Sequence, residues 1–344
     1  MRAADREVKR RLRILDYNKP FRRRIVAENR DFGSTKRLGY STPLETVDLG
    51  GRLELTSDPD SVRQLMRIAE LPVTVPGTRV RILLNEVEGI DAPAVLFLCS
   101  RIRRLARMNA RISGTYPNDA GARQTLADAD FDGFVSGTRR LNAQPTAGQQ
   151  LQLIEGNFEG DIIEVDPDVS VQIQEFLQKR NPTLVAVEAD HLSLAVAECL
   201  ENVGSHAYGE RWPWTRGPKA WFVVGLYNEA TKTTSVAILD TGVGIVKSVT
   251  TNMSRLGKLF SADADLLEDA TLGILTQSTD PKHGKGLRSL REFAVTSPGR
   301  SFHVMSSGRM ITWRKDCSPI KRSLPKFDGT IVCLEIQETA GASP

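Results

Sequence analysis

Three polar residues, Glu198, Asn202 and His206, recur at four-residue spacing in the second half of the chain. This spacing places them on one face of a helix, because four residues advance a helix by little more than one turn. The apolar residues of the same stretch predict a buried opposite face: Leu192, Val196, Leu200 and Val203. Asp190 is suited to cap the start of this helix. The carboxylate and the amide predict a site that faces a cavity, whereas His206 is expected to be structural.

A second polar set follows a predicted strand. Residues 235 to 239 form a largely apolar run that ends at Asp240, where Gly242 and Gly244 interrupt the pattern. A carboxylate at this point can accept a hydrogen bond, for instance from the exocyclic amine of adenine, and glycine lets the backbone approach a ligand closely. Taken alone, the pattern fits an ordinary turn after a strand equally well.

A third set combines glycine with positive charge. Gly284 and Gly286 stand at the start of a predicted helix at 287 to 293. The free N–H groups at a helix N-terminus favour anions such as phosphate. Three basic residues add positive charge there, although in isolation they would be ordinary surface charge: Lys282, Lys285 and Arg288.

The order of these motifs, followed by Gly329 and Thr330 at the start of an apolar strand, resembles the GHKL ATP-binding superfamily over roughly residues 165 to 338. That superfamily includes gyrase, the large heat-shock chaperones, sensor histidine kinases and mismatch-repair ATPases. Within it, the Glu-x-x-x-Asn-x-x-x-His-Ala-Tyr pattern at 198 to 208 looks most like the bacterial anti-sigma-factor serine kinases. Two positions depart from that pattern, because Val203 stands where most relatives have alanine and Ser205 near where many carry lysine.

The resemblance implies ATP and Mg²⁺ as cofactors. Asn202 would coordinate the Mg²⁺ that bridges the phosphates, and Glu198 would orient or deprotonate the nucleophile. Asp240 would bind adenine with help from Thr330. The other residues implied to contact the nucleotide are Gly242, Gly244, Ile245, Lys282, Gly284, Lys285, Gly286 and Leu287. Residues 246 to 283 would form a lid that orders over ATP, although a plain insertion with two short helices also fits.

The first half of the chain predicts strands that alternate with helices, at 79 to 84, 93 to 108, 110 to 114 and 118 to 128. This alternation predicts a βαβ unit. The run from 85 to 91 resembles that of a STAS domain, the fold of anti-sigma-factor antagonists, over about residues 45 to 140. Phosphorylated antagonists carry a serine just after the position of Asp91, whereas this chain has Ala92, Pro93 and Ala94. A STAS-like unit here is therefore expected to dock or dimerise rather than to be phosphorylated.

The composition agrees with the intracellular regulator that the resemblance implies. The 344 residues, of which 40% are hydrophobic, suffice for two domains. The four cysteines lack disulfide or metal-site spacing, which fits a reducing cytoplasm: Cys99, Cys199, Cys317 and Cys333. No apolar run approaches the roughly 20 residues that span a bilayer, and the charged N-terminus lacks the apolar core of a signal peptide, so no membrane is expected.

Residues 1 to 40 form a predicted basic arm, with 13 Lys or Arg residues against 5 Asp or Glu residues. Such an arm could bind nucleic acid, and Tyr17 and Phe21 could stack on bases. A solvated helix, or a tail that binds an acidic protein, is favoured over this because no sequence-specific DNA-binding motif accompanies the charge.

The sequence thus predicts an α+β protein with a STAS-like βα domain at 41 to 140, a linker and lead-in at 141 to 164, and a GHKL domain at 165 to 340. The GHKL domain is expected to have helices on one face of a mixed sheet. Two functions remain open at this point. One is an ATPase or protein serine/threonine kinase that acts on a regulatory protein partner, and the other is an ATP-gated interaction module without significant catalysis. Homodimerisation on ATP binding is an expectation from the superfamily alone.

Overall fold

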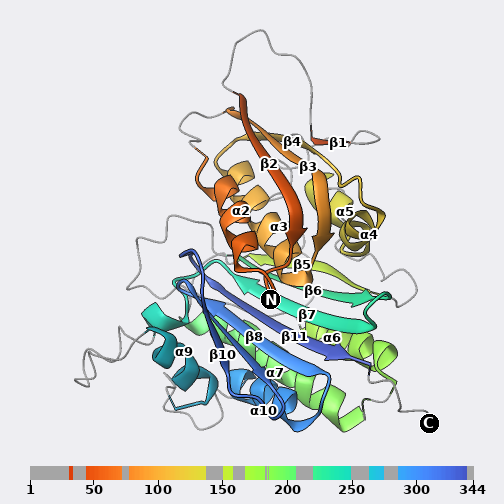
Figure 1. The fold of residues 1–344 in the computed structure, drawn as a ribbon, viewed down its shortest axis with the longest axis vertical. Coiled ribbons are helices and arrows are strands. Elements are labelled where there is room, and N and C mark those ends of the chain that lie inside the picture. The colour runs from red at the N-terminus through yellow and green to blue at the C-terminus, as the bar shows by residue number, and fades with distance from the viewer. Residues whose placement is uncertain are drawn as a thin grey trace, which may run out of the picture.

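The computed structural model describes residues 31–33, 44–71, 77–136, 150–157, 167–182, 184, 186–206, 220–248, 263–274 and 286–338. The described chain is a mixed α+β structure with two sheets (Figure 1). Residues 141 to 149 and 158 to 164 of the predicted linker and lead-in, and most of the predicted basic arm, lie outside the described residues.

The N-terminal unit is built on a four-stranded sheet with the strand order β1-β4-β3-β2. Its strands are β1 Asp31–Gly33, β2 Leu44–Leu53, β3 Arg79–Ile90 and β4 Arg111–Thr115. Its helices are α2 Pro59–Ala69, α3 Ala92–Arg107, α4 Ala120–Asp128 and α5 Phe131–Ser136. β3 runs parallel to both β2 and β4, because α2 and α3 carry the chain back between them. This confirms the predicted βαβ unit.

The C-terminal unit is built on a seven-stranded sheet with the strand order β10-β9-β8-β11-β7-β6-β5. Its strands are β5 Leu151–Asn157, β6 Ala220–Asn228, β7 Thr233–Asp240, β8 Arg300–Ser306, β9 Arg309–Arg314, β10 Ile320–Ser323 and β11 Thr330–Gln337. Every described pairing in it is antiparallel. The expectation of a mixed sheet is wrong, because short hairpins join β6 to β7 and β8 to β9 and a hairpin can connect only antiparallel strands.

Helices cover one face of this larger sheet. They are α6 Pro167–Arg180, α7 Ala186–His206, α9 Asp263–Thr271 and α10 Gly286–Thr296. In Figure 1 they lie below the seven-stranded sheet, on the side away from the N-terminal unit. The apolar residues predicted to pack from α7 are all buried in the core that these helices share with the sheet: Leu192, Val196, Leu200 and Val203.

The other face of the seven-stranded sheet packs against α3, which lies between the two sheets. Fourteen of the 16 residues of α3 are buried, and one apolar cluster contains Phe97 of α3 together with Phe222 of β6 and Leu239 of β7. The ring of Phe97 also meets that of Phe327 edge-on, with centroids 5.4 Å apart. The two units therefore share a core.

Several predicted boundaries shift in the structure. β1 lies within the predicted basic arm and pairs with β4, and β5 lies within the predicted lead-in and pairs with β6. β3 continues to Ile90, whereas the sequence predicted a strand that ends at 84. α7 begins at Ala186, so Asp190 lies inside the helix and does not cap it; its carboxylate instead accepts a hydrogen bond from Gln174 of α6.

None of the helices that the structure describes is long and apolar enough to cross a membrane.

Candidate functional site

Asp240 and Thr330 lie opposite each other where β7 ends and β11 begins. Asp240 is 7% exposed, and its carboxylate accepts a hydrogen bond of 2.8 Å from the N–H of Gly242. Thr330 donates to the same carboxylate from its hydroxyl and its backbone N–H. Burial raises the pKa of Asp240 to about 6, against these hydrogen bonds, which lower it. The carboxylate is therefore ionised at neutral pH and can accept a hydrogen bond from an amine.

Two glycines let the loop after Asp240 fold against β11. A Cβ on Gly244, which has φ +84°, would lie 2.7 Å from Ser306 Oγ and 3.0 Å from the carbonyl oxygen of Gly329. A Cβ on Gly329, which has φ +104°, would lie 2.0 Å from the carbonyl oxygen of Asp240. Both positions thus need the conformation and the small size of glycine. The loop after Asp240 and the loop that ends at Gly329, about 90 residues apart in the sequence, therefore lie against each other.

Ser306 holds this loop in place through two hydrogen bonds, and it is not among the site residues predicted from the sequence. Its hydroxyl accepts a hydrogen bond of 2.9 Å from the N–H of Ile245 and donates one of 3.3 Å to the carbonyl oxygen of Gly329. Ser306 stands at the end of β8, and its partners become apparent only when β8 is known to pair with β11. The serine preceding a Ser-Gly turn is the only local signal that the sequence offers.

Beyond Ile245, residues 245 to 248 form one helical turn. Val246 is buried in the same apolar cluster as Val203 of α7 and Leu290 of α10. The loop after Asp240 therefore borders the core on the helix-covered face of the sheet, the face on which α7 and α10 lie.

The N-terminus of α10 abuts α7 at the turn that carries Glu198. A Cβ on Gly286 would lie 2.7 Å from the carbonyl oxygen of Ala195 and 3.1 Å from Cys199 Sγ. Glu198 is half-buried, and its charge, after burial, raises the pKa of the adjacent Cys199 thiol. Gly286 and Glu198 are thereby brought to the same part of the fold, as the resemblance implies. Leu287 packs against the core beside them.

Other predicted site residues are only partly described. Asn202 belongs to α7, one turn after Glu198, but its side chain and that of His206 lie outside the described residues. The same is true of three residues expected at the phosphates: Lys282, Gly284 and Lys285. Of the predicted lid at 246 to 283, the structure describes residues 246–248 and 263–274.

Among the residues that the structure describes, no three His, Cys, Asp or Glu side chains gather so as to hold a metal ion. The Mg²⁺ that the resemblance implies would not need such a cluster, because Mg²⁺ keeps several waters and takes one or two protein oxygens beside the phosphates. The amide of Asn202 is an oxygen donor of this kind.

No model of a known protein family matches this chain, and no curated protein matches it either. The assignment of the site therefore depends on its motifs and on the geometry described above.

Proposed function

We propose that this protein binds ATP with Mg²⁺ in a GHKL-type pocket, between the ends of β7 and β11 and the helices α7 and α10. The observation that carries the proposal is the meeting of Asp240, Gly242 and Thr330 at one point. A buried carboxylate there, oriented by Gly242 and Thr330, offers the acceptor that the amine of adenine requires. The close approach of Gly286 to α7 supports a phosphate site near Glu198.

Within this proposal, Glu198 is the residue that acts on the nucleophile. Its carboxylate would hold a water molecule, or a hydroxyl of a partner protein, in line with the γ-phosphate and accept its proton. Asn202 would hold the metal ion, which neutralises charge on the phosphates. The products would be ADP and either free phosphate or a phosphorylated partner. The proposed role is that of an intracellular regulator, and the N-terminal unit, with its STAS-like βα arrangement, would be its interaction module.

A second candidate function is an ATP-gated interaction module in which turnover is incidental. One observation favours it: α3 of the N-terminal unit packs on the same strand β7 that ends in Asp240. Binding of the nucleotide at the end of this strand could bias how the N-terminal unit is held, without any chemistry.

The test uses purified protein, γ-labelled ATP and two substitutions on α7. Glu198→Gln should leave ATP affinity equal or slightly higher and lower phosphate release or transfer by about 10² to 10⁴-fold, the usual loss for a general base. Glu201→Gln, three residues further along the same helix at an exposed site, is the matched control and should change neither.

Asp240→Asn should weaken ATP binding by about tenfold or more, because the amide presents a donor where the adenine amine needs an acceptor. Titration calorimetry with folded protein measures this. Unchanged affinity would remove Asp240 from the pocket and with it the proposal. If the wild-type protein binds ATP normally but shows no turnover, alone or with proteins encoded beside it, the result would favour the ATP-gated interaction module over an enzyme.

A further inference from the structure

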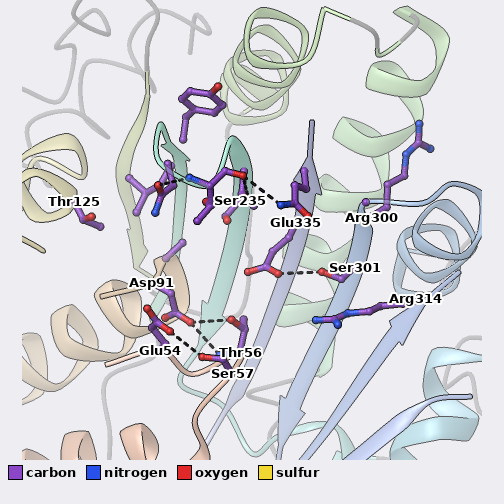
Figure 2. Close-up of a pocket in the computed structure, with 18 of the residues that line it drawn as sticks. Glu54, Thr56, Ser57, Asp91, Thr125, Ser235, Arg300, Ser301, Arg314 and Glu335 are labelled. Atoms are coloured by element: carbon purple, nitrogen blue, oxygen red, sulfur yellow. Dashed lines mark hydrogen bonds between the residues drawn. The ribbon is translucent and has the colours of Figure 1, made fainter. Parts of the chain in front are cut away.

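A second polar site lies at the junction of the two units. It is a cleft of about 640 Å³, shown in Figure 2. From the N-terminal unit it is lined by the carboxyl ends of the parallel strands β2 and β3 and by the start of α3, and from the C-terminal unit by β6, β7, β8, β9 and β11. Crevices at the carboxyl ends of parallel strands are where open α/β sheets bind ligands.

The sheet face that forms one wall changes character where the cleft begins. Along β11, Ile331 and Cys333 pack against the N-terminal unit, and the next residues on that face, Glu335 and Gln337, line the cleft. Along β7, Leu239 and Ala237 are followed in the same way by polar residues: Ser235 and Thr233. On both β7 and β11, the side chains on this face thus change from apolar to polar where the cleft begins.

Glu335 is held in place by a buried network. Its Oε2 lies 3.1 Å from His303 Nε2 and accepts a hydrogen bond of 3.0 Å from Ser301 Oγ. His303 is 1% exposed and contacts Thr312 Oγ1 at 3.0 Å through Nδ1. Burial favours the neutral acid, but His303, Ser301 and the charge of Arg314 hold the pKa of Glu335 below its ordinary value. The sheet therefore presents an ionised carboxylate in a fixed position.

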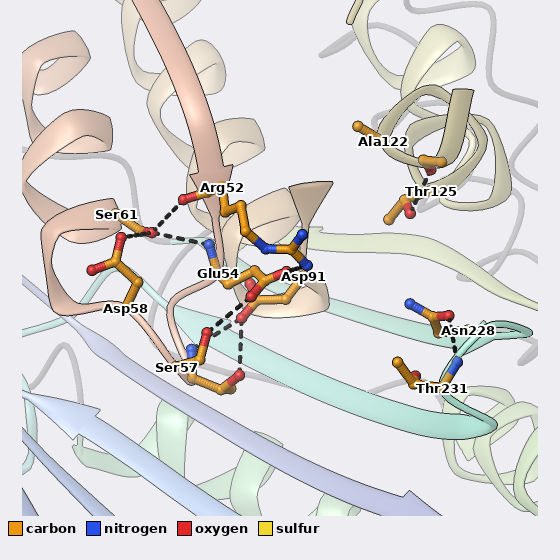
Figure 3. Close-up of polar contacts among 12 residues, drawn as sticks. Arg52, Glu54, Ser57, Asp58, Ser61, Asp91, Ala122, Thr125, Asn228 and Thr231 are labelled. Atoms are coloured by element: carbon orange, nitrogen blue, oxygen red, sulfur yellow. Dashed lines mark hydrogen bonds and ion pairs between the residues drawn. The ribbon is translucent and has the colours of Figure 1, made fainter. Parts of the chain in front are cut away.

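Asp91 presents a second carboxylate from the N-terminal unit. It is the N-cap of α3, and its Oδ1 accepts a hydrogen bond of 2.8 Å from the N–H of Ala94. Its Oδ2 accepts from the N–H and the hydroxyl of Thr56, at 3.0 and 3.2 Å. Figure 3 shows this carboxylate beside the ion pair of Arg52 with Glu54. Asp91 and Glu335 line the same cleft, and the negative charge of Glu335 contributes to raising the pKa of Asp91.

The cations around the cleft are partly engaged with other groups. Arg52 pairs with Glu54, and Arg300 pairs with Glu188 at 3.1 Å, outside the cleft lining. The charged residues that face the cleft from the elements around it are Arg52 at the end of β2, Glu54 just after it, Asp91 at α3, Asp128 on α4, Arg300 on β8, Arg314, Lys315 and Asp316 at the end of β9, and Glu335 on β11. Carboxylates are thus slightly in excess at a site with two fixed acidic groups.

We propose that this cleft binds a small organic cation, an alkylammonium or guanidinium compound, with Asp91 and Glu335 as its counter-ions. A bound cation removes the repulsion between the two carboxylates and forms charge-assisted hydrogen bonds with both. N–H groups of the ligand that are not bound by a carboxylate would donate hydrogen bonds to the hydroxyls of Thr56, Ser235 and Ser301, which also line the cleft. Such a site is separate from the proposed ATP pocket, because Asp240 stands at the far end of β7 from Thr233.

Cation binding here is coupled to a proton. Burial, and then the charge of Glu335, raise the pKa of Asp91 to about 7. A cation favours the ionised form, so its binding should release a proton from Asp91 below pH 7. Because an alkylammonium group stays protonated up to about pH 10, any change in affinity between pH 6 and 8 must come from the titration of a group on the protein.

The experiment is titration calorimetry of the full chain, without nucleotide, with putrescine and agmatine as probes and the neutral diol analogue of putrescine as the control ligand. At least one of the two cations should bind at pH 8, about tenfold more weakly at pH 6, and the diol should not bind. Glu335→Gln should weaken binding by about tenfold or more. Asp60→Asn, at an exposed position on α2, should leave it unchanged.

Asp91→Asn provides a second test, because asparagine also serves as an N-cap and the circular dichroism of the variant shows whether it folds. It should remove the pH dependence as well as weaken binding. The proposal is overturned if neither cation binds at millimolar concentration, if Mg²⁺ or K⁺ competes at equal concentration, or if Glu335→Gln and Asp91→Asn both bind as the wild type does. ATP is absent throughout, so failure here leaves the ATP proposal untouched.

Discussion

At the scale of single residues, Asp240 illustrates how a binding group destabilises the fold that carries it. Its carboxylate is buried at the end of β7, and even with hydrogen bonds from Gly242 and Thr330 its pKa is raised to about 6. The folded protein therefore holds the proton of Asp240 more tightly than the unfolded chain, in which the ordinary value of 3.8 applies. Ionisation is the state that an adenine amine needs, and it costs stability until a ligand is bound.

This cost has a definite sign and pH range. The free energy of unfolding should fall as the pH rises from about 4 to about 6, because the unfolded chain ionises Asp240 first. Asp240→Asn cannot ionise, so the variant should gain stability relative to the wild type over that range, by up to about 3 kcal/mol. Urea unfolding of both proteins at pH 4.0 to 7.0, in the absence of ATP, measures the difference.

Asp91 and the other acids titrate in both proteins, so their contributions to the free energy of unfolding cancel when the two proteins are compared. Asp60→Asn, at an exposed site, should give a profile parallel to that of the wild type. A parallel profile for Asp240→Asn as well would mean that Asp240 is not desolvated in the folded protein.

At the scale of elements, α9 changes the interpretation of the proposed lid. A lid that orders only over ATP should bury little apolar area of its own, but within α9 Leu266 and Leu267 are almost fully buried and belong to the core under the sheet. Lys321 of β10 also forms ion pairs with Asp265 and Glu268 of this helix. That the lid orders over ATP stays a prediction, but we expect α9 itself to be held in place without ATP, because its two adjacent leucines, within an acidic stretch, face the protein.

Hydrogen exchange separates α9 from the rest of the range. Amides of 263–271 should be protected with or without a non-hydrolysable ATP analogue, since opening the helix exposes both leucines. Any protection that depends on ATP should fall on the other residues of 246 to 283. Fast exchange throughout α9 in the absence of nucleotide, followed by protection on binding, would restore the original lid.

At the scale of the whole molecule, the two units form one body because α3 is buried between two sheets. The charged residues of α3 take part in this packing. Arg101 lies over the ring of Phe97 at 4.3 Å and Arg103 over that of Phe134 at 4.5 Å, and Arg103 also pairs with Glu155 of β5. Burial, and then the charge of Arg104, lower the pKa of Arg101 to about 10, so the guanidinium stays charged within the interface.

A shared core predicts cooperative unfolding of the whole chain. Phe97→Ala removes a ring that is 0% exposed and should destabilise the protein by about 3 to 5 kcal/mol. Trp221 and Trp313 report on the C-terminal unit by fluorescence, and peptide-resolved thiol labelling of the buried Cys99 reports on the N-terminal unit. Both probes should move to lower denaturant together in the variant, as they should coincide in the wild type.

Met108→Ala, an exposed site directly after α3, is the control and should shift neither transition by more than about 0.5 kcal/mol. Two separate transitions, with only that of Cys99 affected by Phe97→Ala, would show that the units fold independently.

The sequence predicts what depends on local pattern. The period of the apolar residues identified α7, β7 and the βαβ unit, and glycine placement identified the turns after Asp240 and before Thr330. It could not predict that α3 contacts two sheets, because Arg101 and Arg103 suggest a solvent-facing side and their aromatic partners were unknown. Ser306 and the cleft at Asp91 and Glu335 were missed for a related reason: each depends on which distant strands lie side by side, and neither is marked by a local pattern.

The burial of α3 between two sheets also bears on how the protein is made. A chain grows from its N-terminus, so α3 leaves the ribosome long before the strands that cover it, of which β11 ends at Gln337. At the usual 5 to 20 residues per second, about 230 further residues require roughly 10 to 45 s. The apolar surface of α3 has no partner from its own chain until Phe222 of β6 and Leu239 of β7 have been made, and the sheet that covers it stays incomplete until β11 follows. The nascent N-terminal half is therefore expected to need protection by a chaperone, and a slower rate of synthesis should increase its aggregation.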